Sequence, residues 1–266
     1  MFVPDDTVIT ALAGVLGLVV GSFLNVVVYR VPRAQSLVRP ASHCPACASP
    51  VRPWHNVPVL GWLVLRGRCA DCRAPISVRY PLVELGTGVL FAAVTARFGL
   101  SPELPAYLYL AAIAVALALI DLDVMRLPDR IVLPSYLVTG VLLLLAAVAA
   151  GSWRDAGRAL LAMGALYAGY WLLAFVYPDG MGFGDVKLAG LLGLYLGWLG
   201  WNSVWVGTFA GFLVGGVVGV VLLATRRATG RTAIPFGPAM LVGGFLAVFA
   251  ATPITVWYSS LLLPSG

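Results

Sequence analysis

Two aspartates, Asp121 and Asp185, stand at the edges of very apolar stretches of the sequence. Asp121 ends the run AAIAVALALID at residues 111–121, and Asp185 closes the segment GFGD at residues 182–185. Ionisable side chains at membrane depth are costly and rare, and they are usually functional where they occur. Two carboxylates that meet can share a proton around a water molecule, which is the chemistry of aspartyl proteases. The elements that carry them decide whether they meet.

The composition is that of a membrane protein. The chain has 266 residues, of which 61% are hydrophobic and only 11% are charged, whereas soluble domains carry about 25% charged residues. The net charge of +6 could suggest a nucleic-acid partner, but the charges lie between apolar runs, as the positive-inside rule expects. We therefore expect an all-α, polytopic bundle of membrane-spanning helices that binds no nucleic acid.

Eight apolar segments approach the ~20 residues that a helix needs to cross a bilayer. They are residues 7–29, 81–98, 104–121, 131–150, 157–177, 186–202, 203–224 and 235–258. The first is not predicted to be a cleaved signal peptide, because its flank Pro4-Asp5-Asp6 is acidic and signal peptides begin with a basic region. The expected divisions of the chain are a first transmembrane segment (1–29), a cytoplasmic loop (30–80) and a membrane-embedded core (81–266).

The basic residues predict the orientation of these spans. With the N-terminus outside, the cytoplasmic regions hold 14 of the 17 Lys and Arg residues when Lys187 is counted with its adjacent loop. Only Arg97, Arg154 and Arg158 fall outside them. These cytoplasmic regions are the loops 30–80, 122–130, 178–185 and 225–234.

This topology allows the two aspartates to pair. Two complete spans separate them, so both carboxylates are expected at the cytoplasmic end, at similar depth. Asp121 ends a helix, where the macrodipole disfavours a negative charge; Asp185 begins one, where the dipole favours it, and Lys187 follows two residues on. We therefore predict Asp185 as the ionised base and Asp121 as the protonated acid of a coupled pair. Asp123 is the rival of Asp121, but helical residues two apart point in nearly opposite directions, so only one can face Asp185.

All four cysteines lie in the first predicted cytoplasmic loop. They form two CxxC pairs, Cys44-Pro-Ala-Cys47 and Cys69-Ala-Asp-Cys72, with 21 residues between the pairs. Each CxxC turn directs two thiolates at one metal, so the pairs predict a zinc ribbon with a structural, four-thiolate zinc ion. Two disulfides are disfavoured because the predicted orientation places the loop in the reducing cytosol. A redox function needs only one such pair. The only two histidines, which flank the first pair, are left outside the site.

Several motifs, in order along the chain, resemble those of the type IV prepilin peptidases, and the resemblance runs from about residue 20 to 245. Gly61 departs from the serine expected before the tryptophan. A GxGD segment alone is weak, because glycine is common in membrane helices, but several ordered motifs together with the cysteine loop are specific. The motifs are GSFLNVVVYRVP (21–32), HNVPVLGWLVLRGRCADCRAPISVRYPLVE (55–84), IDLD (120–123) with LPD (127–129), GMGFGDVKL (180–188) and IPFGP (234–238).

The resemblance implies an intramembrane aspartyl protease of the GxGD class in the bacterial inner membrane. Such enzymes cleave the short basic leader from prepilins and pseudopilins on the cytoplasmic side. Their two catalytic aspartates map onto Asp121 and Asp185. Members with this cysteine loop also methylate the new N-terminal amine with S-adenosylmethionine, an activity that rests here on the resemblance alone, because the loop holds no Gly-rich nucleotide signature.

Several residues near these motifs admit two interpretations. Gly182 and Gly184 would let the backbone approach the substrate and free φ at the loop-to-helix junction, or they are only small packing residues. Lys187 is expected to support this loop. Glu84 either complements the dipole in the first turn of the second span or belongs to a methyl-transfer site. Asp129 is interpreted as a helix N-cap.

Two other classes of function compete with the protease. A proton-coupled transporter could use Asp121 and Asp185 as a relay, and a non-catalytic scaffold could dock a partner through its zinc loop. The GxGD context and the zinc loop favour the protease, because proton translocation requires neither. The arginines of the loop could be only an orientation signal. If they contact a charged partner, anionic lipids are favoured over a prepilin leader that is itself basic.

Overall fold

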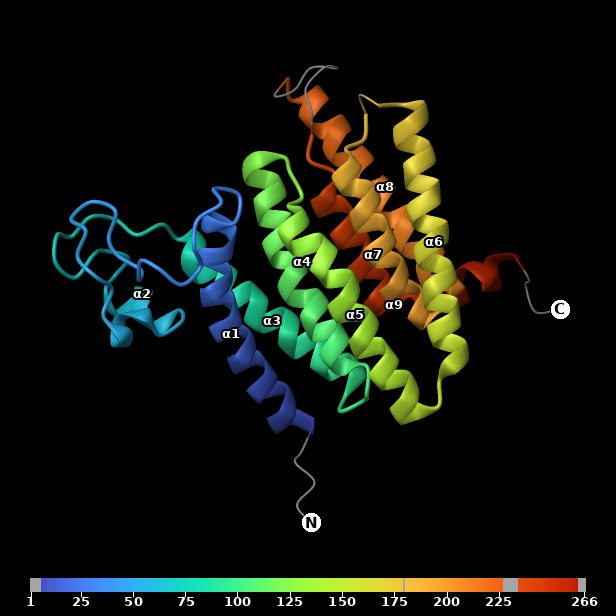
Figure 1. Cartoon of the computed structure of the whole chain (residues 1–266), viewed down its shortest axis with the longest axis horizontal. Coiled ribbons are helices and arrows are strands. Elements are labelled where there is room, and N and C mark those ends of the chain that lie inside the picture. Colours follow the sequence, from blue (N-terminus) through green and yellow to red (C-terminus); the bar gives the residue numbers. More distant parts are fainter. Residues whose placement is uncertain (1–5, 179, 227–233, 263–266) are drawn as a thin grey trace, which may run out of the picture. The chain divides into compact units, whose positions relative to one another are not determined.

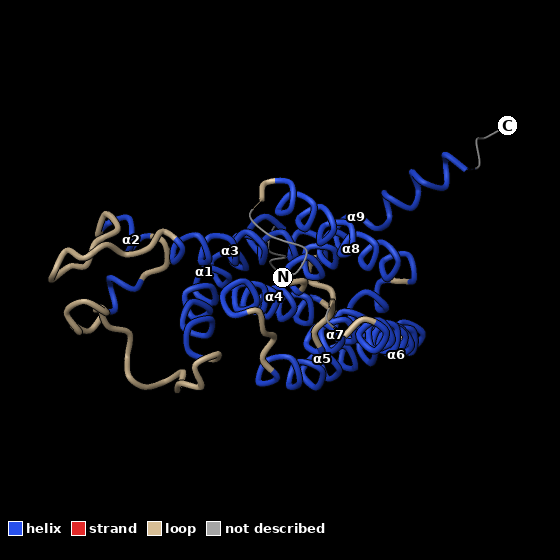
Figure 2. Tube along the Cα trace, turned by 90° about the horizontal axis from the view of Figure 1, so that it is seen from above, coloured by secondary structure: helices blue, strands red, loops and turns tan. Residues whose placement is uncertain are grey.

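The described part of the chain is helical, with no strands (Figure 2). Figure 1 shows the computed structural model, which describes residues 6–178, 180–226 and 234–262. Contacts divide the chain into two compact units, Met1–Ala116 and Leu117–Gly266, so the boundary falls within one helix. The acidic flank Pro4-Asp5 and most of the predicted loop 225–234 lie outside the described residues.

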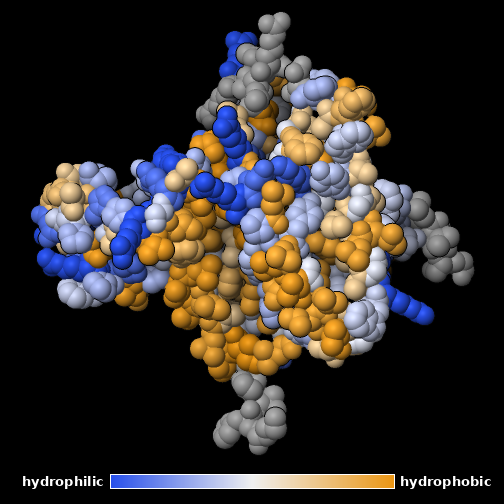
Figure 3. Space-filling view, viewed as in Figure 1, coloured by the Kyte–Doolittle hydropathy of each residue, from blue (hydrophilic) through white to orange (hydrophobic). Residues whose placement is uncertain are grey.

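Each of the eight predicted spans is a helix. Within the described residues, seven helices are long and apolar enough to cross a membrane, and their outward faces are largely apolar in Figure 3. The expected all-α, multi-pass architecture is therefore confirmed. The described helices are α1 (Asp6–Arg30), a 3-10 turn (Pro53–Asn56), α2 (Leu60–Val64), α3 (Arg79–Phe98), α4 (Leu104–Val124), α5 (Asp129–Ala150), α6 (Trp153–Val176), α7 (Phe183–Leu199), α8 (Trp201–Ala224) and α9 (Gly237–Leu262).

The sixth predicted span, α7, is not among those seven helices, and it is short because protein surrounds it. It has 17 residues, and every residue from Val186 to Trp198 except Lys187 is buried. It contacts α5, α6, α8 and α9. Its glycines allow close approach: a Cβ at Gly193 would lie 2.7 Å from the Cα of Met163 on α6. A helix buried in protein on all sides does not need the full length of a lipid-facing span, and the fold thus holds α7 at the centre of its unit.

Three polar contacts fasten α7 to α5. The Tyr136 hydroxyl donates to the carbonyl of Lys187 at 2.6 Å, and the hydroxyls of Thr139 and Tyr195 are hydrogen-bonded at 2.7 Å. The ammonium group of Lys187 lies 2.7 Å from the carboxylate of Asp129. The interpretation of Asp129 as an N-cap is therefore wrong: Pro128 holds the cap position, and the Asp129 side chain pairs with Lys187 instead. These contacts fix the position of α7 along α5.

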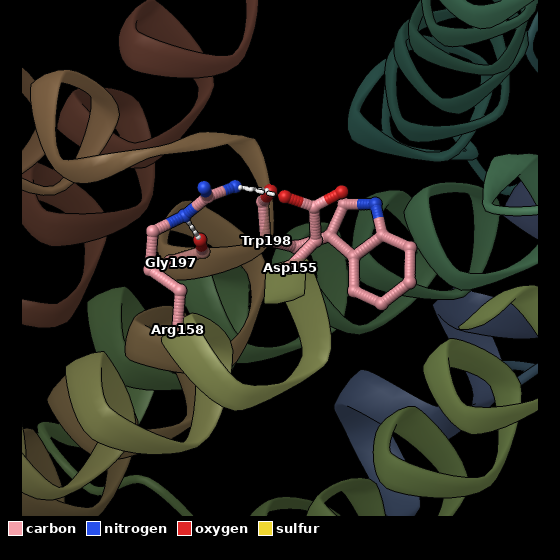
Figure 4. Close-up of polar contacts among 4 residues, drawn as sticks. All are labelled: Asp155, Arg158, Gly197 and Trp198. Atoms are coloured by element: carbon pink, nitrogen blue, oxygen red, sulfur yellow. Dashed lines mark hydrogen bonds and ion pairs between the residues drawn. The ribbon is translucent and has the colours of Figure 1, made fainter. Parts of the chain in front are cut away.

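Arg158 of α6 secures the opposite end of α7 (Figure 4). Its guanidinium donates to the carbonyls of Gly197 and Trp198 at 2.6 and 2.5 Å and pairs with Asp155 at 2.7 Å. The last carbonyls of a helix have no partner within the helix, so the arginine satisfies two of them. This contact gives a structural reason for one of the three basic residues that the orientation rule left unexplained.

Replacing Arg158 with alanine should loosen this helix end. It removes two charge-assisted hydrogen bonds, each contributing about 1.5–3 kcal/mol before discounting for partial exposure. We expect a fall on the order of 5 °C in the midpoint of thermal unfolding in detergent. The matched control is Arg154→Ala, at an exposed position one turn earlier, which should change the midpoint by less than about 1 °C. Equal shifts in both variants would contradict the capping role.

In the first unit, α1 and α3 pack through small residues. A Cβ at Gly17 would lie 2.8 Å from the Cα of Gly88, and one at Gly21 would lie 2.7 Å from the Cα of Glu84. Such contacts between small residues are a common way for membrane helices to approach closely. At the end of this hairpin, the Asn25 amide donates to the carbonyl of Tyr80 at 3.2 Å. The loop between α1 and α3 follows Arg30, and its surface is largely hydrophilic in Figure 3.

Candidate functional site

Asp121 lies in the last turn of α4, and its side chain is 5% exposed. Its Oδ2 atom accepts a hydrogen bond of 3.0 Å from the backbone N–H of Gly237, the first residue of α9. Asp123, the rival carboxylate, is exposed. The structure therefore turns Asp121, and not Asp123, into the interior of the helical unit.

Asp185 lies in the first turn of α7, where its Oδ2 atom accepts a hydrogen bond of 3.1 Å from the N–H of Gly182. It is partly buried. Leu127 links its surroundings to those of Asp121, because a Cβ added at Gly184 or at Gly237 would lie 3.1 or 3.3 Å from this leucine. Asp121 and Asp185, called the aspartate pair below, come from α4 and α7 of the same compact unit. Two neighbouring carboxylates of this kind can divide the roles of acid and base.

The two glycines before Asp185 do not have the backbone conformation expected of them. Gly182 has φ −74° and ψ 148°, an extended conformation open to other residues, and Gly184 has no positive φ either. The expectation that they free φ at this junction is wrong. Gly184 instead leaves room for Leu127 of the α4–α5 connection, because a Cβ there would lie 3.1 Å from the Cβ of Leu127. The small residue lets the two segments that carry the aspartate pair approach each other.

Gly237 is the site residue that the sequence reasoning missed. Gly237 belongs to the motif 234–238, but the residues of this motif do not indicate a contact with Asp121. A Cβ at this position would lie 2.7 Å from the Oδ2 atom of Asp121 and 3.3 Å from Leu127. A glycine at the start of a helix and next to a proline was the available signal, although it does not indicate which residue the backbone meets.

Replacing Gly237 with alanine should strongly impair any activity that depends on Asp121. The added methyl group would collide with the carboxylate and displace it from the N–H that orients it. We expect at least a ~100-fold loss of turnover, because small displacements of catalytic groups have effects of that size. The matched control is Gly216→Ala on α8, where nothing lies within 4 Å of the added methyl. Full activity of Gly237→Ala would contradict the close contact.

The four cysteines form one cluster in the first unit. Their sulfur atoms all lie within 4.8 Å of one another, with 3.7 Å between Cys44 and Cys72 and 4.0 Å between Cys47 and Cys69. Zinc–sulfur bonds of about 2.3 Å place the sulfurs of a tetrahedral site about 3.8 Å apart. A short antiparallel bridge encloses each pair, His43 with Pro50 and Arg68 with Pro75. The donor set therefore fits a single tetrahedral metal ion.

The electrostatics of the cluster also suit a cation. Hydrogen bonds from the side chain and the backbone of Ser49 lower the pKa of the Cys47 thiol to about 6. The backbone N–H of Ala74 favours the Cys72 thiolate, but the neighbouring Cys47 opposes it, and the pKa of Cys72 is raised to about 12. The first thiolate to form thus disfavours the next. A bound metal ion removes this opposition, since it stabilises all four thiolates together.

The structure contradicts one of the two interpretations of Glu84, and its part in methyl transfer stays a prediction. Glu84 is the sixth residue of α3, beyond the first turn, so the interpretation as a partner of the helix dipole is wrong. Its side chain is 8% exposed, and its Oε2 atom accepts a hydrogen bond of 2.7 Å from the N–H of Val59 in the cysteine loop. Glu84 therefore attaches this loop to the helical hairpin.

The fold and the site define a multi-pass membrane protein with an acidic pair at helix ends and, in a loop, four clustered cysteines that are positioned to bind a metal. Residues 15–98 match the Bacterial Peptidase A24 N-terminal domain, and residues 108–224 match the Type IV leader peptidase family. The chain belongs to the type IV leader peptidase family.

Curated relatives are similar over nearly the whole chain. Three of them, each named "Prepilin leader peptidase/N-methyltransferase", come from Pseudomonas putida, Neisseria gonorrhoeae and Stutzerimonas stutzeri. The first is 42% identical over 89% of this chain and 89% of the relative. The second is 40% identical and the third 38%, each over 92% of this chain and 91% of the relative. No solved structure matches the chain.

Proposed function

We propose that this protein is a membrane-embedded aspartyl endopeptidase that removes leader peptides from prepilins and pseudopilins and then methylates the new N-terminal amine. Membership in the leader peptidase family supports the cleavage, and the names of the relatives support both activities. The single observation that carries the proposal is that Asp121 and Asp185 converge near Leu127 within one helical unit. Gly237, which lies against Asp121, and Gly184, which precedes Asp185, both approach Leu127 closely. Nothing supports the alternative of a proton-coupled transporter.

In the proposed reaction the aspartate pair divides the work of peptide hydrolysis. Ionised Asp185 removes a proton from a water molecule, whose oxygen attacks the scissile carbonyl carbon, while protonated Asp121 donates a hydrogen bond to the carbonyl oxygen. The tetrahedral intermediate then collapses, the carbon–nitrogen bond breaks, and the departing amine takes a proton from the pair. The Gly237 N–H orients the Asp121 carboxyl group, and the Gly182 N–H orients that of Asp185.

Zinc is the metal that we propose for Cys44, Cys47, Cys69 and Cys72. Four thiolates fill a tetrahedral coordination sphere, so the ion would cross-link the loop and bind no substrate. S-adenosylmethionine is the methyl donor that the proposed second activity requires. It would transfer its methyl group to the neutral amine of the cleaved pilin, which then releases a proton.

We place the protein in the bacterial inner membrane, with the aspartate pair and the cysteine loop facing the cytoplasm. The distribution of basic residues supports this orientation, because regions rich in Lys and Arg remain on the cytoplasmic side. A cytoplasmic loop also suits free thiols, since the four cysteines are not joined in disulfides.

The proposal is tested with purified protein in lipid vesicles and a purified prepilin, with and without S-adenosylmethionine. Mass spectrometry of the pilin should show loss of the leader in both samples and the added mass of one methyl group only where the donor is present. Prepilin of unchanged mass in both samples would contradict the proposal. Cleavage without methylation would remove the second activity.

A further inference from the structure

The hydrogen bond between Glu84 and Val59 determines where the cysteine loop sits relative to α3. Val59 directly precedes α2, and its φ of 61° is a strained conformation for a β-branched residue. Such strain persists only where surrounding contacts hold it. One such contact is the 2.7 Å bond from its N–H to the buried carboxylate of Glu84. The start of α2 is therefore attached to a defined position on α3.

That position lies near the surface of the bilayer. The 20 residues of α3, Arg79–Phe98, make a candidate span whose length of about 30 Å matches the hydrocarbon core. Glu84 lies five residues after Arg79, which is about 7.5 Å along the helix axis. Helical side chains tilt toward the N-terminus, which brings the carboxylate closer to the end of the span. Val59 and α2 are thus held near the boundary between the lipid headgroups and the acyl chains.

The apolar side chains of α2 are exposed on its outer face. Leu60, Leu63 and Val64 share one face of α2 by helical spacing and are exposed, with 76% of Val64 accessible. Trp54, in the 3-10 turn that precedes α2, is exposed as well, with 65% accessible. We call these four residues the apolar stripe. The inner side of α2 is already occupied. Gly61 contacts the backbone of His55 so closely that a side chain there would collide, and the Trp62 indole N–H donates to the carbonyl of Ile76 at 3.1 Å.

Basic residues accompany the stripe. Arg66 and Arg68 are exposed just after it along the chain, and Arg79 begins α3. Arg52 precedes it and is also exposed, although it pairs with Asp71 at 3.4 Å. Apolar side chains with a tryptophan and nearby arginines are typical of segments that lie in the membrane interface. Anionic headgroups attract such basic residues within a short distance of the surface. This arrangement complements a bilayer with negatively charged lipids at the level where Glu84 holds α2.

We propose that residues 54–66 are an interfacial membrane-docking element. The apolar stripe enters the boundary between headgroups and acyl chains, and Arg66 and Arg68 contact the phosphates of anionic lipids. The cysteine loop then rests on the membrane rather than moving freely in water. Neither peptide cleavage nor methylation is needed for this docking, so it is independent of the proposed function.

The test uses the full-length protein in vesicles and the fluorescence of Trp54, obtained as the difference between wild type and Trp54→Phe. Lipids with bromine near the headgroup end of the acyl chain quench a tryptophan in the interface, whereas iodide quenches one in water. We expect Trp54 to be quenched by the brominated lipids and protected from iodide. Adding anionic lipid should strengthen the lipid quenching at least twofold, and Arg66→Gln with Arg68→Gln should abolish that increase.

A second variant examines the stripe itself. Leu60→Gln with Leu63→Gln should transfer Trp54 from lipid quenching to iodide quenching while the protein keeps its bound metal. The control Val38→Gln replaces another exposed residue of the loop that is outside the stripe, and it should leave the signal of Trp54 unchanged. The proposal is overturned if iodide quenches wild-type Trp54 and brominated lipid does not. It is also overturned if protection appears only with added prepilin or at high protein density, since the stripe would then bind protein.

Discussion

Asp185→Asn and Asp121→Asn should each reduce prepilin cleavage by at least roughly a thousandfold, because each removes one half of an acid–base pair. The rate is measured with purified variants in vesicles from the appearance of mature pilin. Both substitutions keep the shape of the side chain and the oxygen that accepts the N–H of Gly182 or Gly237. Expression and membrane insertion should therefore be unchanged.

The control for this pair is Asp123→Asn, which alters the exposed carboxylate two residues from Asp121 and should retain most of the activity. The double variant of the pair should lose no more activity than either single variant, because residues that act as a unit have non-additive effects. Losses that multiply in the double variant would mean that the two aspartates act separately. Full cleavage by either single variant would remove that residue from the mechanism.

Replacing Cys44 and Cys47 together with alanine should eliminate the bound metal, which wild-type protein should contain at about one ion per chain. Metal binding to such a site contributes to the folding of the segment that carries it. The loop should therefore become sensitive to proteolysis in the variant. The aspartate pair belongs to the other compact unit. We therefore expect the loss in the rate of methylation to exceed the loss in the rate of cleavage by about tenfold or more.

The matched control replaces both histidines of the loop with alanine. Neither His43 nor His55 belongs to the cluster, so metal content and loop protection should not change. Metal analysis of freshly purified wild type identifies the ion. Wild-type protein without zinc and with disulfide-bonded cysteines would contradict both the site and the predicted orientation of the loop. Equal losses of cleavage and methylation would show that the loop serves both activities.

The sequence was sufficient to predict features that depend on local patterns. The apolar runs predicted all eight helices, because the length of a bilayer-spanning segment is a strong constraint. The two CxxC pairs predicted the clustering of four thiols. Topology alone indicated that Asp121 and Asp185 could lie at the same end of the bundle. That expectation needed only the number of crossings between them and no knowledge of packing.

Features that depend on contacts between distant segments could not be predicted. Gly237 lies against Asp121 although 116 positions separate them, and no periodicity reports such a contact. In the sequence Arg158 is only an exception to the positive-inside rule, whereas in the structure its guanidinium caps the end of α7. Asp129 had the position of a helix cap, but its partner Lys187 comes from another helix. Each of these roles is determined by a tertiary neighbour.

The most direct test of the account uses the Asp185→Asn protein in vesicles with S-adenosylmethionine and two substrates, intact prepilin and pilin that has already been cleaved. Mass spectrometry follows both. The account predicts that intact prepilin keeps its leader and stays unmethylated, while the cleaved pilin gains one methyl group, which shows that the variant is folded. Removal of the leader by this variant would contradict the central claim that Asp185 is one half of the catalytic pair.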